Sequence, residues 1–372
     1  MPAIKVFLVD DSAVMRQTVA YLLKDSPEVE LLGSAPNPLI AMRSLQQQRP
    51  DVLLLDIEMP GMDGLTFLRQ VMATDPIPTV ICSSLSTQGS KVALDALAAG
   101  AVSVVAKPKL GLKQFLEESR LELITALKAA ARARPRLRVQ STPMQRPSAA
   151  TAPGSGGAAP GHPAPTAAPQ RAPATLGLHA FAVNKPVVIG SSTGGTQALE
   201  QILTALPPDA PGIAITQHMP EKFTAMYADR MNQACAVQVR EARDGDRLER
   251  GLVLIAPGGR HLHLRKAGGQ YYAVVSDGPP VNRHRPSVDV LFKSTAECAG
   301  RDALAIILTG MGDDGARGMK LMHDGGARTI AQNEATCVVF GMPNEAIKLG
   351  GVDEILPLDQ VARAILQFDA RG

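Results

Sequence analysis

A short segment rich in glycine and serine could hold a nucleophile in the second half of the chain. Residues Gly190 to Gly194 read G-S-S-T-G, which fits the pattern G-x-S-x-G with Ser192 at its centre. The apolar run before them predicts a strand and the run after them a helix, as in the sharp turn that exposes a catalytic serine. The helix N-terminus would favour a developing negative charge. A phosphate cradle or a plain tight turn would share this pattern, so the surrounding residues must decide.

A nucleophilic serine needs a base, and histidine is the usual one. His218 ends the apolar run GIAITQH, so in a parallel sheet it would lie at the same edge as Ser192. We therefore expect His218 to be the base. His284, in the loop sequence VNRHRPS, stays a second candidate. His261 and His263 alternate within a strand-like run, where packing is the commoner role.

The third member of such a site is an acid that orients the imidazole. Asp313 and Asp314 follow the apolar run ALAIILTG, again at the carboxyl end of a predicted strand. Their positions in the sequence do not show which of the two orients the imidazole. Asp289 is a weaker option because it is expected to open a helix. The resulting order along the chain is serine, histidine, aspartate, whereas standard α/β-hydrolases have the histidine last.

A second group of polar residues lies at strand ends in the first third of the chain. Asp10 and Asp11 end the first predicted strand and Asp56 ends the third, so three carboxylates would crowd together. An all-oxygen site of this kind suits Mg²⁺. Ser83 and Lys107 end the fourth and fifth strands, where a phosphoryl group on a carboxylate would need donors. An acid that merely caps a loop would explain one of these residues, but not five polar residues at the ends of four strands.

Apolar and amphipathic segments alternate through the first block and predict a five-stranded, doubly wound parallel sheet. The predicted strands are Ile4–Val9, Val29–Gly33, Val52–Asp56, Thr79–Ser83 and Val102–Ala106. The predicted helices are Ala13–Lys24, Leu39–Gln47, Leu65–Met72, Ser90–Ala98 and Leu112–Ala131. Chemistry in such sheets gathers at the carboxyl ends of the strands, which is where the five polar residues fall.

The second block alternates in the same way and predicts another α/β parallel sheet. Its strands are expected at Val187–Gly190, Gly212–Thr216, Leu304–Thr309 and Thr329–Gln332, and its helices at Glu221–Cys235, Ala316–His323 and Leu358–Phe368. A middle section differs, with Leu252–Ala256, then HLHL, then QYYAVV. Because Gly268 and Gly269 separate the last two runs, this section predicts an antiparallel β-hairpin insertion.

Length and composition divide the chain further. At 372 residues it exceeds what one hydrophobic core usually serves, so two domains are expected. The stretch from Ala133 to Asn184 is rich in Pro, Ala and Gly and contains no acidic residue, which is typical of a flexible linker. We therefore expect domains at 1–127 and 185–372, joined by a linker at 128–184.

Other features of the sequence limit the cellular compartments and the classes of partner to be expected. The four cysteines lie far apart and form no CxxC pair, which argues against a zinc ribbon or a disulfide framework. The N-terminus lacks a signal-peptide pattern, and no apolar run approaches membrane-spanning length. A net charge of +3 is too small to indicate nucleic acid by itself. We expect a cytoplasmic protein that is not inserted in a membrane and binds no nucleic acid.

The first block resembles the receiver domains of two-component response regulators, which have the flavodoxin-like fold. The resemblance covers about residues 1–127 and lies in the motifs VDDS, LLDIEMPGMDG, SS and AKP. It implies that Asp56 accepts a phosphoryl group from a histidine kinase and that Asp10 and Asp11 help hold Mg²⁺. It also implies that Ser83 and Lys107 contact the phosphoryl oxygens.

The second block resembles the catalytic domain of the CheB family of chemotaxis methylesterases. The resemblance covers about residues 185–368, in the motifs IGSSTGGTQAL, ITQHMP, APGGRHL, RPSVDVLF and LTGMGDDGARGM. It implies Ser192 as nucleophile, His218 as general base and Asp314 as orienting acid. It further implies that backbone near Thr193 and Met311 helps form the oxyanion site.

The order receiver, linker, hydrolase implies a phosphorylation-regulated enzyme of chemotaxis adaptation. Such an enzyme demethylates glutamate γ-methyl esters on methyl-accepting chemotaxis receptors, releasing methanol, and deamidates receptor glutamines. The expected partners are those receptors and the histidine kinase of the chemotaxis pathway. No cofactor is expected for the hydrolase chemistry.

Three other functions are weighed against this one. A DNA-binding output would require a helix-turn-helix with a basic recognition helix, and the second block shows neither. A non-catalytic adaptor would not need the Ser192, His218 and Asp314 set. An esterase for receptors outside flagellar chemotaxis stays open.

Overall fold

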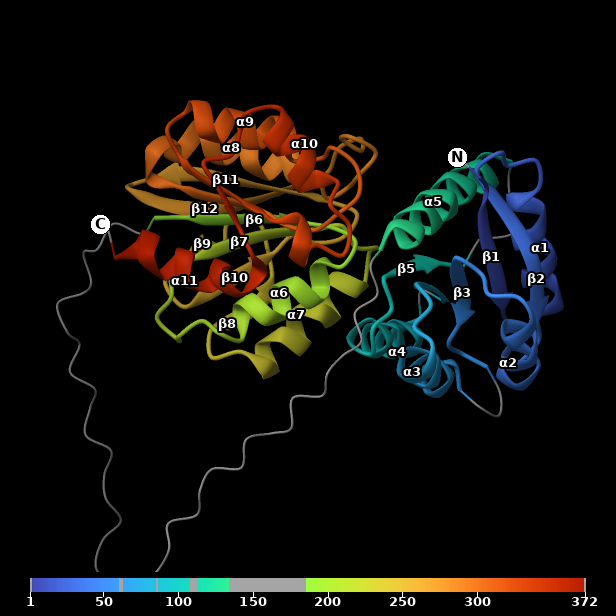
Figure 1. The fold of residues 1–372 in the computed structure, drawn as a ribbon. Coiled ribbons are helices and arrows are strands. Elements are labelled where there is room, and N and C mark those ends of the chain that lie inside the picture. The colour runs from blue at the N-terminus through green and yellow to red at the C-terminus, as the bar shows by residue number, and fades with distance from the viewer. Residues whose placement is uncertain (1, 60–62, 85, 108–112, 134–184, 371–372) are drawn as a thin grey trace, which may run out of the picture. The chain divides into compact units, whose positions relative to one another are not determined.

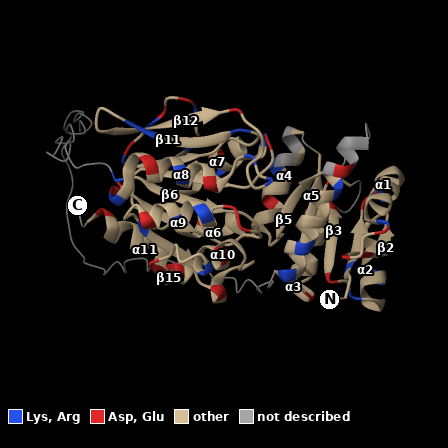
Figure 2. Ribbon diagram, turned by 90° about the horizontal axis from the view of Figure 1, so that it is seen from above, with Lys and Arg blue, Asp and Glu red and all other residues tan. Residues whose placement is uncertain are grey.

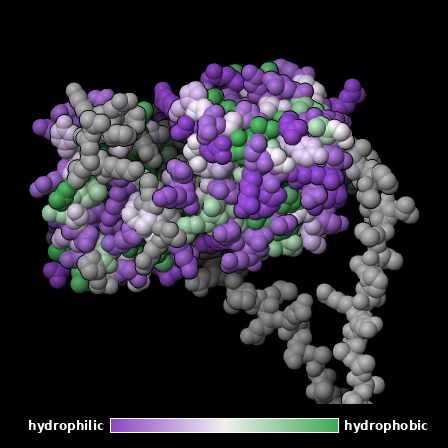
Figure 3. Space-filling view, turned by 180° about the vertical axis from the view of Figure 1, so that it is seen from behind, coloured by the Kyte–Doolittle hydropathy of each residue, from purple (hydrophilic) through white to green (hydrophobic). Residues whose placement is uncertain are grey.

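The structure is a computed structural model that describes residues 2–59, 63–84, 86–107, 113–133 and 185–370. Residues 2–133 and residues 185–370 each form a parallel sheet of their own. Figure 1 shows the helices and strands of both. Acidic and basic residues are interspersed along the helices of each domain (Figure 2). The face drawn in Figure 3 mixes hydrophilic residues with smaller groups of hydrophobic ones.

The first domain is a five-stranded parallel sheet in the order β2-β1-β3-β4-β5, as the sequence predicted. Its strands are β1 (Ile4–Val9), β2 (Val29–Ala35), β3 (Val52–Asp56), β4 (Thr79–Ser83) and β5 (Ser103–Ala106). Its helices are α1 (Ala13–Leu23), α2 (Pro38–Gln47), α3 (Gly64–Thr74), α4 (Thr87–Ala98) and α5 (Lys113–Arg132). The strand order reverses beside β1, so the carboxyl ends of β1 and β3 flank the crevice where such sheets bind ligands.

Local sequence explains where the first helices of this domain begin. Ser12, Asn37 and Asp63 each accept a hydrogen bond from a backbone N–H of the first turn of α1, α2 and α3. Side-chain oxygens at this position satisfy donors that the helix itself leaves unpaired. The loop after β1 is therefore short, which keeps Asp10 and Asp11 at the sheet edge.

The second domain is built on a seven-stranded parallel sheet in the order β15-β14-β13-β6-β7-β10-β8. The strands are β6 (Val187–Ser191), β7 (Ile213–Gln217), β8 (Gln238–Glu241), β10 (Leu252–Ile255), β13 (Leu304–Ile307), β14 (Arg328–Gln332) and β15 (Glu354–Leu356). A separate antiparallel sheet contains β9 (Arg247–Leu248), β11 (His261–Ala267) and β12 (Gln270–Ser276). The α/β fold and the hairpin insertion are thus confirmed.

One strand differs from its expected place. The sequence grouped Leu252–Ala256 with the hairpin, but β10 lies in the main sheet, parallel to both β7 and β8. All four residues of β10 are buried. A continuous apolar run is typical of a parallel strand that is covered on both faces, and not of a hairpin strand with one exposed face.

Helices cover both faces of the seven-stranded sheet (Figure 1). One face packs against α6 (Gly195–Leu203), α7 (Phe223–Ala234) and α11 (Leu358–Asp369). The other packs against α8 (Val288–Ala299), α9 (Ala316–Asp324), α10 (Met342–Lys348) and the three-stranded sheet. This cover leaves the carboxyl ends of β6, β7 and β13 as the edge where polar side chains can gather.

The helices are of moderate length and amphipathic or mixed in character. Within the described ranges, none is both long enough and apolar enough to cross a membrane.

Candidate active site

Ser192 lies on a sharp turn between β6 and α6. β6 ends at Ser191, and α6 begins at Gly195 after Gly194, whose φ of 79° lies in the left-handed region. A β-carbon at Gly194 would lie 2.5 Å from Cβ of Val338, so only glycine fits this turn. The backbone N–H of Ser192 donates to the carbonyl of Thr309 at 3.0 Å. The strand–turn–helix that the sequence predicted is confirmed.

The two adjacent serines have different surroundings. Ser191 is fully buried, and its hydroxyl donates to Oε1 of Gln217 at 2.7 Å. The amide of Gln217 in turn donates to the carbonyls of Ser192 and His218, at 2.9 and 3.0 Å. Ser192 is half-buried, and its hydroxyl makes no hydrogen bond to any described residue. Ser191 therefore braces the turn, while the Ser192 hydroxyl is available for chemistry.

His218 lies on the strand next to Ser192. Ser191 and Gln217 are paired in register between β6 and β7, and the N–H of His218 donates to the carbonyl of Ser191 at 3.0 Å. Nε2 of His218 lies 2.7 Å from Oδ2 of Asp314. Nδ1 is buried and has no hydrogen-bond partner among the described residues. This second nitrogen is thus the one that could accept a proton from Ser192.

The two candidate aspartates are separated clearly by their surroundings. Asp314 is only 1% exposed and contacts His218. The side chain of Asp313 is 59% exposed and pairs with Arg317 at 3.2 Å. The third candidate, Asp289, lies in the first turn of α8, as expected, and accepts from the N–H of Gly318. Only Asp314 of the three contacts the imidazole.

The carboxylate of Asp314 is held by donors from the start of α8 and from the loop before it. It accepts from the Ser287 hydroxyl at 2.7 Å, from the Val288 N–H at 2.7 Å and from the Asn282 amide at 2.8 Å. Burial alone would raise its pKa, but the hydrogen bond and charge of His218 and the bonds from Asn282 and Ser287 lower the pKa below its ordinary value. The carboxylate is therefore ionised throughout the physiological range and can fix the imidazole.

His284, the second histidine candidate, lies against the first one. Its ring stacks on that of His218 with centroids 3.7 Å apart and an interplanar angle of 9°. Burial and the neighbouring His218 lower the pKa of His284 to about 3. His284 contacts neither Ser192 nor Asp314 through any hydrogen bond within the described chain, so its observed contact is a neutral ring that covers His218.

This lowered pKa predicts a pH dependence of stability. The unfolded chain binds a proton at His284 near pH 6.5, whereas the folded chain binds it only near pH 3. Between those values protonation favours the unfolded state, so the free energy of unfolding should fall as the pH drops from 6.5 toward 3. Urea unfolding at a series of pH values, compared with His284→Gln, measures this contribution. A slope in that window that is identical in wild type and variant would contradict it.

Two backbone groups near Ser192 could bind an oxyanion. The N–H groups of Thr193 and Met311 donate to no acceptor in the described ranges. The carbonyl of Thr193 accepts from the Thr309 hydroxyl at 2.9 Å, which fixes this part of the turn. Unpaired donors beside a nucleophile are what a tetrahedral intermediate requires.

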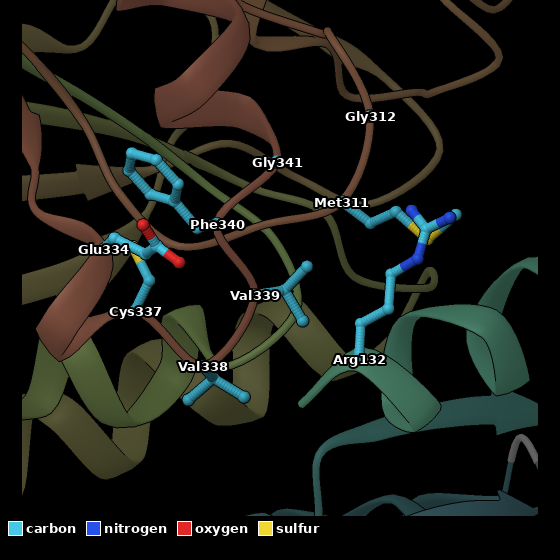
Figure 4. A pocket seen from close by; sticks show the side chains of 9 residues that line it. All are labelled: Arg132, Met311, Gly312, Glu334, Cys337, Val338, Val339, Phe340 and Gly341. Carbon is cyan, nitrogen blue, oxygen red and sulfur yellow. The ribbon is translucent and has the colours of Figure 1, made fainter. Parts of the chain in front are cut away.

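The loop before α10 fixes the backbone next to Met311. The N–H groups of Gly341 and Met342 donate to the carbonyl of Gly310 at 3.0 and 2.8 Å. Figure 4 shows Phe340 and Gly341 beside Met311 and Gly312, at the wall of a pocket. A β-carbon at Gly310 would lie 2.8 Å from Cβ of Ser192, so glycine is required for this close approach.

The receiver domain gathers its own polar site at the ends of β1, β3 and β5. Oxygens of Asp10, Asp11 and Asp56 lie within 4.8 Å of one another. Nζ of Lys107 lies 2.7 Å from Oδ2 of Asp56 and 3.7 Å from Oδ2 of Asp10. Ser83 is buried at the end of β4 and donates to the carbonyl of Ser84 at 3.2 Å.

This acidic cluster fits a divalent cation. Asp10 and Asp56 are fully buried, and burial together with the charge of Asp56 raises the pKa of Asp10, which Lys107 only partly offsets. Oδ2 of Asp10 is also buried without a hydrogen-bond partner in the described chain. Oxygen ligands with one left unpaired are what a hard cation such as Mg²⁺ binds.

Sequence reasoning missed several residues that support the hydrolase site. Gln217 immediately precedes His218, and Asn282 and Ser287 lie in the same loop as His284. Their roles depend on contacts between segments far apart in sequence, such as Asn282 with Asp314. The one available signal was a concentration of polar residues in NRHRPS beside an apolar helix.

A receiver domain followed by an α/β domain with serine, histidine and aspartate at one sheet edge defines a response regulator with a hydrolase output. The family models agree with this class. The CheB methylesterase model matches residues 187–365, and the response regulator receiver domain model matches residues 6–118. The chain belongs to the CheB family.

Curated relatives match along nearly the whole chain. The protein-glutamate methylesterase/protein-glutamine glutaminase 2 of Dechloromonas aromatica (strain RCB) is 53% identical over 368 residues, covering 98% of both chains. The corresponding protein 1 of Chromobacterium violaceum is 52% identical over 365 residues, again covering 98% of both. Among solved structures, the CheB methylesterase catalytic domain of Thermotoga maritima is 38% identical, with a TM-score of 0.48, and covers 50% of this chain and 98% of that one.

Proposed function

We propose that this chain hydrolyses glutamate γ-methyl esters on methyl-accepting chemotaxis receptors, releasing methanol, and deamidates receptor glutamines to glutamate. It is a protein-glutamate methylesterase and protein-glutamine glutaminase regulated by a receiver domain. The receptors as substrates, the residues that act and the kinase partner are parts of this proposal.

The proposed reaction uses Ser192 as nucleophile. Its hydroxyl oxygen attacks the ester carbonyl while Nδ1 of His218 takes the hydroxyl proton. The oxyanion of the tetrahedral intermediate is stabilised by the N–H groups of Thr193 and Met311. When the intermediate collapses, His218 returns the proton to the leaving oxygen, which departs as methanol and leaves an acyl-enzyme.

Water completes the cycle by the same route. His218 removes a proton from a water molecule, which attacks the acyl-enzyme and forms a second tetrahedral intermediate. Its collapse releases the glutamate side chain and returns the proton to Ser192. With a glutamine substrate, the first leaving group is ammonia. One set of residues therefore serves both reactions, because both pass through an acyl-enzyme.

The single observation that carries this mechanism is the hydrogen bonding of the two ring nitrogens of His218. Nε2 lies 2.7 Å from Oδ2 of Asp314, and Nδ1 is buried with no hydrogen-bond partner in the described ranges. The backbone N–H of His218 bonds to the carbonyl of Ser191, next to the serine turn. Leaving a buried ring nitrogen unpaired costs free energy, so such an atom needs an explanation. A rotation of the Ser192 side chain toward Nδ1 supplies one.

Regulation in this proposal begins at Asp56, which accepts a phosphoryl group from the histidine kinase of the chemotaxis pathway. Asp10, Asp11 and Asp56 would hold Mg²⁺, which offsets the negative charge that gathers during phosphoryl transfer. Lys107, already bonded to Asp56, and Ser83 are the donors placed to contact the phosphoryl oxygens.

We also propose the domain division 1–127, 128–184 and 185–372. The receiver match at residues 6–118 and the methylesterase match at 187–365 support it. Helix α5 continues past the first boundary to Arg132, so the last turn of the receiver helix lies in the segment assigned to the linker. A cytoplasmic location completes the proposal, because the kinase and the methylated receptor segments would have to be reached there.

We expect Asp56→Asn to abolish the response to phosphorylation while leaving basal activity. Asparagine keeps the size of the side chain but cannot form the acyl phosphate. Methanol release from methylated receptor membranes should rise several-fold when a small phosphodonor and Mg²⁺ are added to wild type. It should not change for Asp56→Asn.

A matched control is Asp51→Asn, which alters an exposed acid near the start of β3. It should retain the full response. Stimulation of Asp56→Asn equal to that of wild type would contradict the assignment of Asp56. An absence of methanol release under every condition would contradict the proposed activity itself.

A further inference from the structure

A tight turn with an unusual backbone borders the hydrolase site. Val281 and His284 exchange two backbone hydrogen bonds, of 3.0 and 2.9 Å, across residues 282 and 283. Asn282 and Arg283 have φ of 49° and 69°, both in the left-handed region. Two positive φ values in succession define a type I′ turn, which favours Asn followed by Gly.

The first residue of this turn suits its backbone and anchors it. Asn tolerates the left-handed region better than most residues. Its amide donates to Oδ2 of Asp289 at 2.6 Å and to Oδ1 of Asp314 at 2.8 Å. The last residue of the turn, His284, stacks on His218. The turn is therefore fixed directly to the groups proposed for catalysis.

Arg283 does not suit its position in the turn. A β-carbon in the left-handed region approaches the following carbonyl, and glycine would avoid that cost. Strained backbone of this kind persists where the surrounding structure enforces it, and it often marks a functional site. The benefit of an arginine here must therefore come from its side chain.

The neighbouring arginines have partners, whereas Arg283 has none within the part of the chain that the structure describes. Arg260 pairs with Asp277 at 3.0 Å, Arg285 donates to the carbonyl of Gly278 at 2.6 Å, and Arg317 pairs with Asp313 at 3.2 Å. The exposed guanidinium of Arg283 makes no hydrogen bond or ion pair with any described residue. Nothing in the described chain thus accounts for an arginine at this position.

We propose that Arg283 is a specificity-determining residue that binds a carboxylate of the substrate protein close to the scissile ester or amide. This inference rests on the proposed function. Each turnover converts a neutral ester or amide into a glutamate carboxylate, so a substrate with several modifiable glutamates presents carboxylates beside the esters that remain. A guanidinium can bind such a carboxylate through two parallel hydrogen bonds.

The position of Arg283 supports this role. The turn is bonded to Asp314 through Asn282 and stacked on His218 through His284, so the backbone of Arg283 between them is held close to these two residues. A bound carboxylate would then orient the neighbouring ester toward Ser192. Fixed geometry of this kind limits the entropy that substrate binding must lose.

The test compares two substrates with two variants of the full-length chain. The substrates are methyl-accepting receptors with a single methylated glutamate, flanked by either glutamate or alanine. For wild type we expect kcat/KM, measured by methanol release, to be about tenfold higher with glutamate flanks, the ratio that a free-energy difference of about 1.4 kcal/mol gives. For Arg283→Gln and Arg283→Gly we expect this ratio to fall to near 1, mainly through KM.

Arg283→Gly separates recognition from folding. Because glycine relieves the left-handed backbone, the variant should have a raised Tm while losing the preference for acidic flanks. The control is Arg363→Gln, which removes an exposed charge from α11 and should keep the wild-type ratio.

Three outcomes would overturn the inference. The first is an unchanged ratio in both Arg283 variants, and the second is a ratio near 1 in wild type. The third is an equal loss of the ratio in Arg363→Gln, which would show a general effect of net charge. Failure of wild type to release methanol from either receptor would instead overturn the proposed function, so the two failures are distinguishable.

Discussion

Ser192→Ala should reduce methanol release from methylated receptors by roughly 10⁴- to 10⁶-fold, the range expected when a serine nucleophile is removed. The Ser192 hydroxyl has no hydrogen-bond partner among the described residues, whereas the hydroxyl of Ser191 and the carbonyl of Ser192 are both hydrogen-bonded to Gln217. The variant removes one oxygen of a half-buried residue and no hydrogen bond of the described chain. Its fold and Tm should therefore stay close to those of wild type. A discontinuous methanol assay on full-length, phosphorylated protein measures the loss.

Ser191→Ala is the matched control for this prediction. The Ser191 hydroxyl donates to Gln217, so its removal leaves a buried acceptor unpaired and should destabilise the domain by about 1–3 kcal/mol. Methanol release should nevertheless persist at a readily measured rate. Equal losses in the two variants would mean that the turn, and not one hydroxyl, is what activity requires.

Asp314→Asn should lower kcat by about 10⁴-fold, the effect seen when an orienting aspartate becomes an amide. The carboxylate fixes which ring nitrogen of His218 carries the proton. An amide can instead donate to Nε2 and so leave Nδ1 protonated, which prevents it from acting as a base. Because several donors already converge on Asp314, the variant also places an amide group opposite the Ser287 hydroxyl or the Val288 N–H. A loss of stability should accompany the loss of activity.

Asp313→Asn supplies the comparison for Asp314. Its side chain is more than half exposed and pairs only with Arg317 in the described chain, an arrangement worth at most about 1 kcal/mol. Because the Asp313 side chain pairs with Arg317 and not with His218, we expect kcat within about twofold of wild type. The steady-state kinetics of the two variants, measured side by side, would contradict the assignment if Asp313→Asn were the more impaired.

The sequence predicted the receiver domain almost completely. All five strands and five helices were expected, because each strand is a short apolar run bounded by turn residues and each helix is amphipathic. The acidic site followed from the same pattern, since Asp10 and Asp56 directly end buried strands. Parallel sheets bring such ends together, so one-dimensional position is enough to predict proximity.

The hydrolase site was predictable only in part, for a physical reason. Ser192 and His218 end neighbouring strands, and that pattern is visible in the sequence. Choosing between Asp313 and Asp314 was not possible from position, because the direction of each side chain depends on how the loop after β13 turns. In the structure Asp314 is buried beside α8, whereas Asp313 is exposed. The resemblance to the CheB family, and not spacing, identified Asp314.

Contacts between loops could not be predicted from the sequence. Asn282 and His284 belong to a tight turn with a left-handed backbone. No sequence pattern indicated this turn, because Asn-Arg is not a usual pair at its centre. Likewise, β10 was grouped with the hairpin that follows it. Its insertion between β7 and β8 depends on the burial of both of its faces, which an apolar run of four residues does not distinguish.

The most direct test of the account is covalent labelling of full-length protein with a serine-directed fluorophosphonate, followed by peptide mass mapping. If the buried Nδ1 of His218, which has no hydrogen-bond partner among the described residues, activates the Ser192 hydroxyl, a single adduct should form on Ser192 with loss of fluoride. Labelling should be slowed by orders of magnitude in His218→Ala and be absent in Ser192→Ala. An adduct on Ser191, or labelling of Ser192 at the wild-type rate without His218, would contradict the proposed triad.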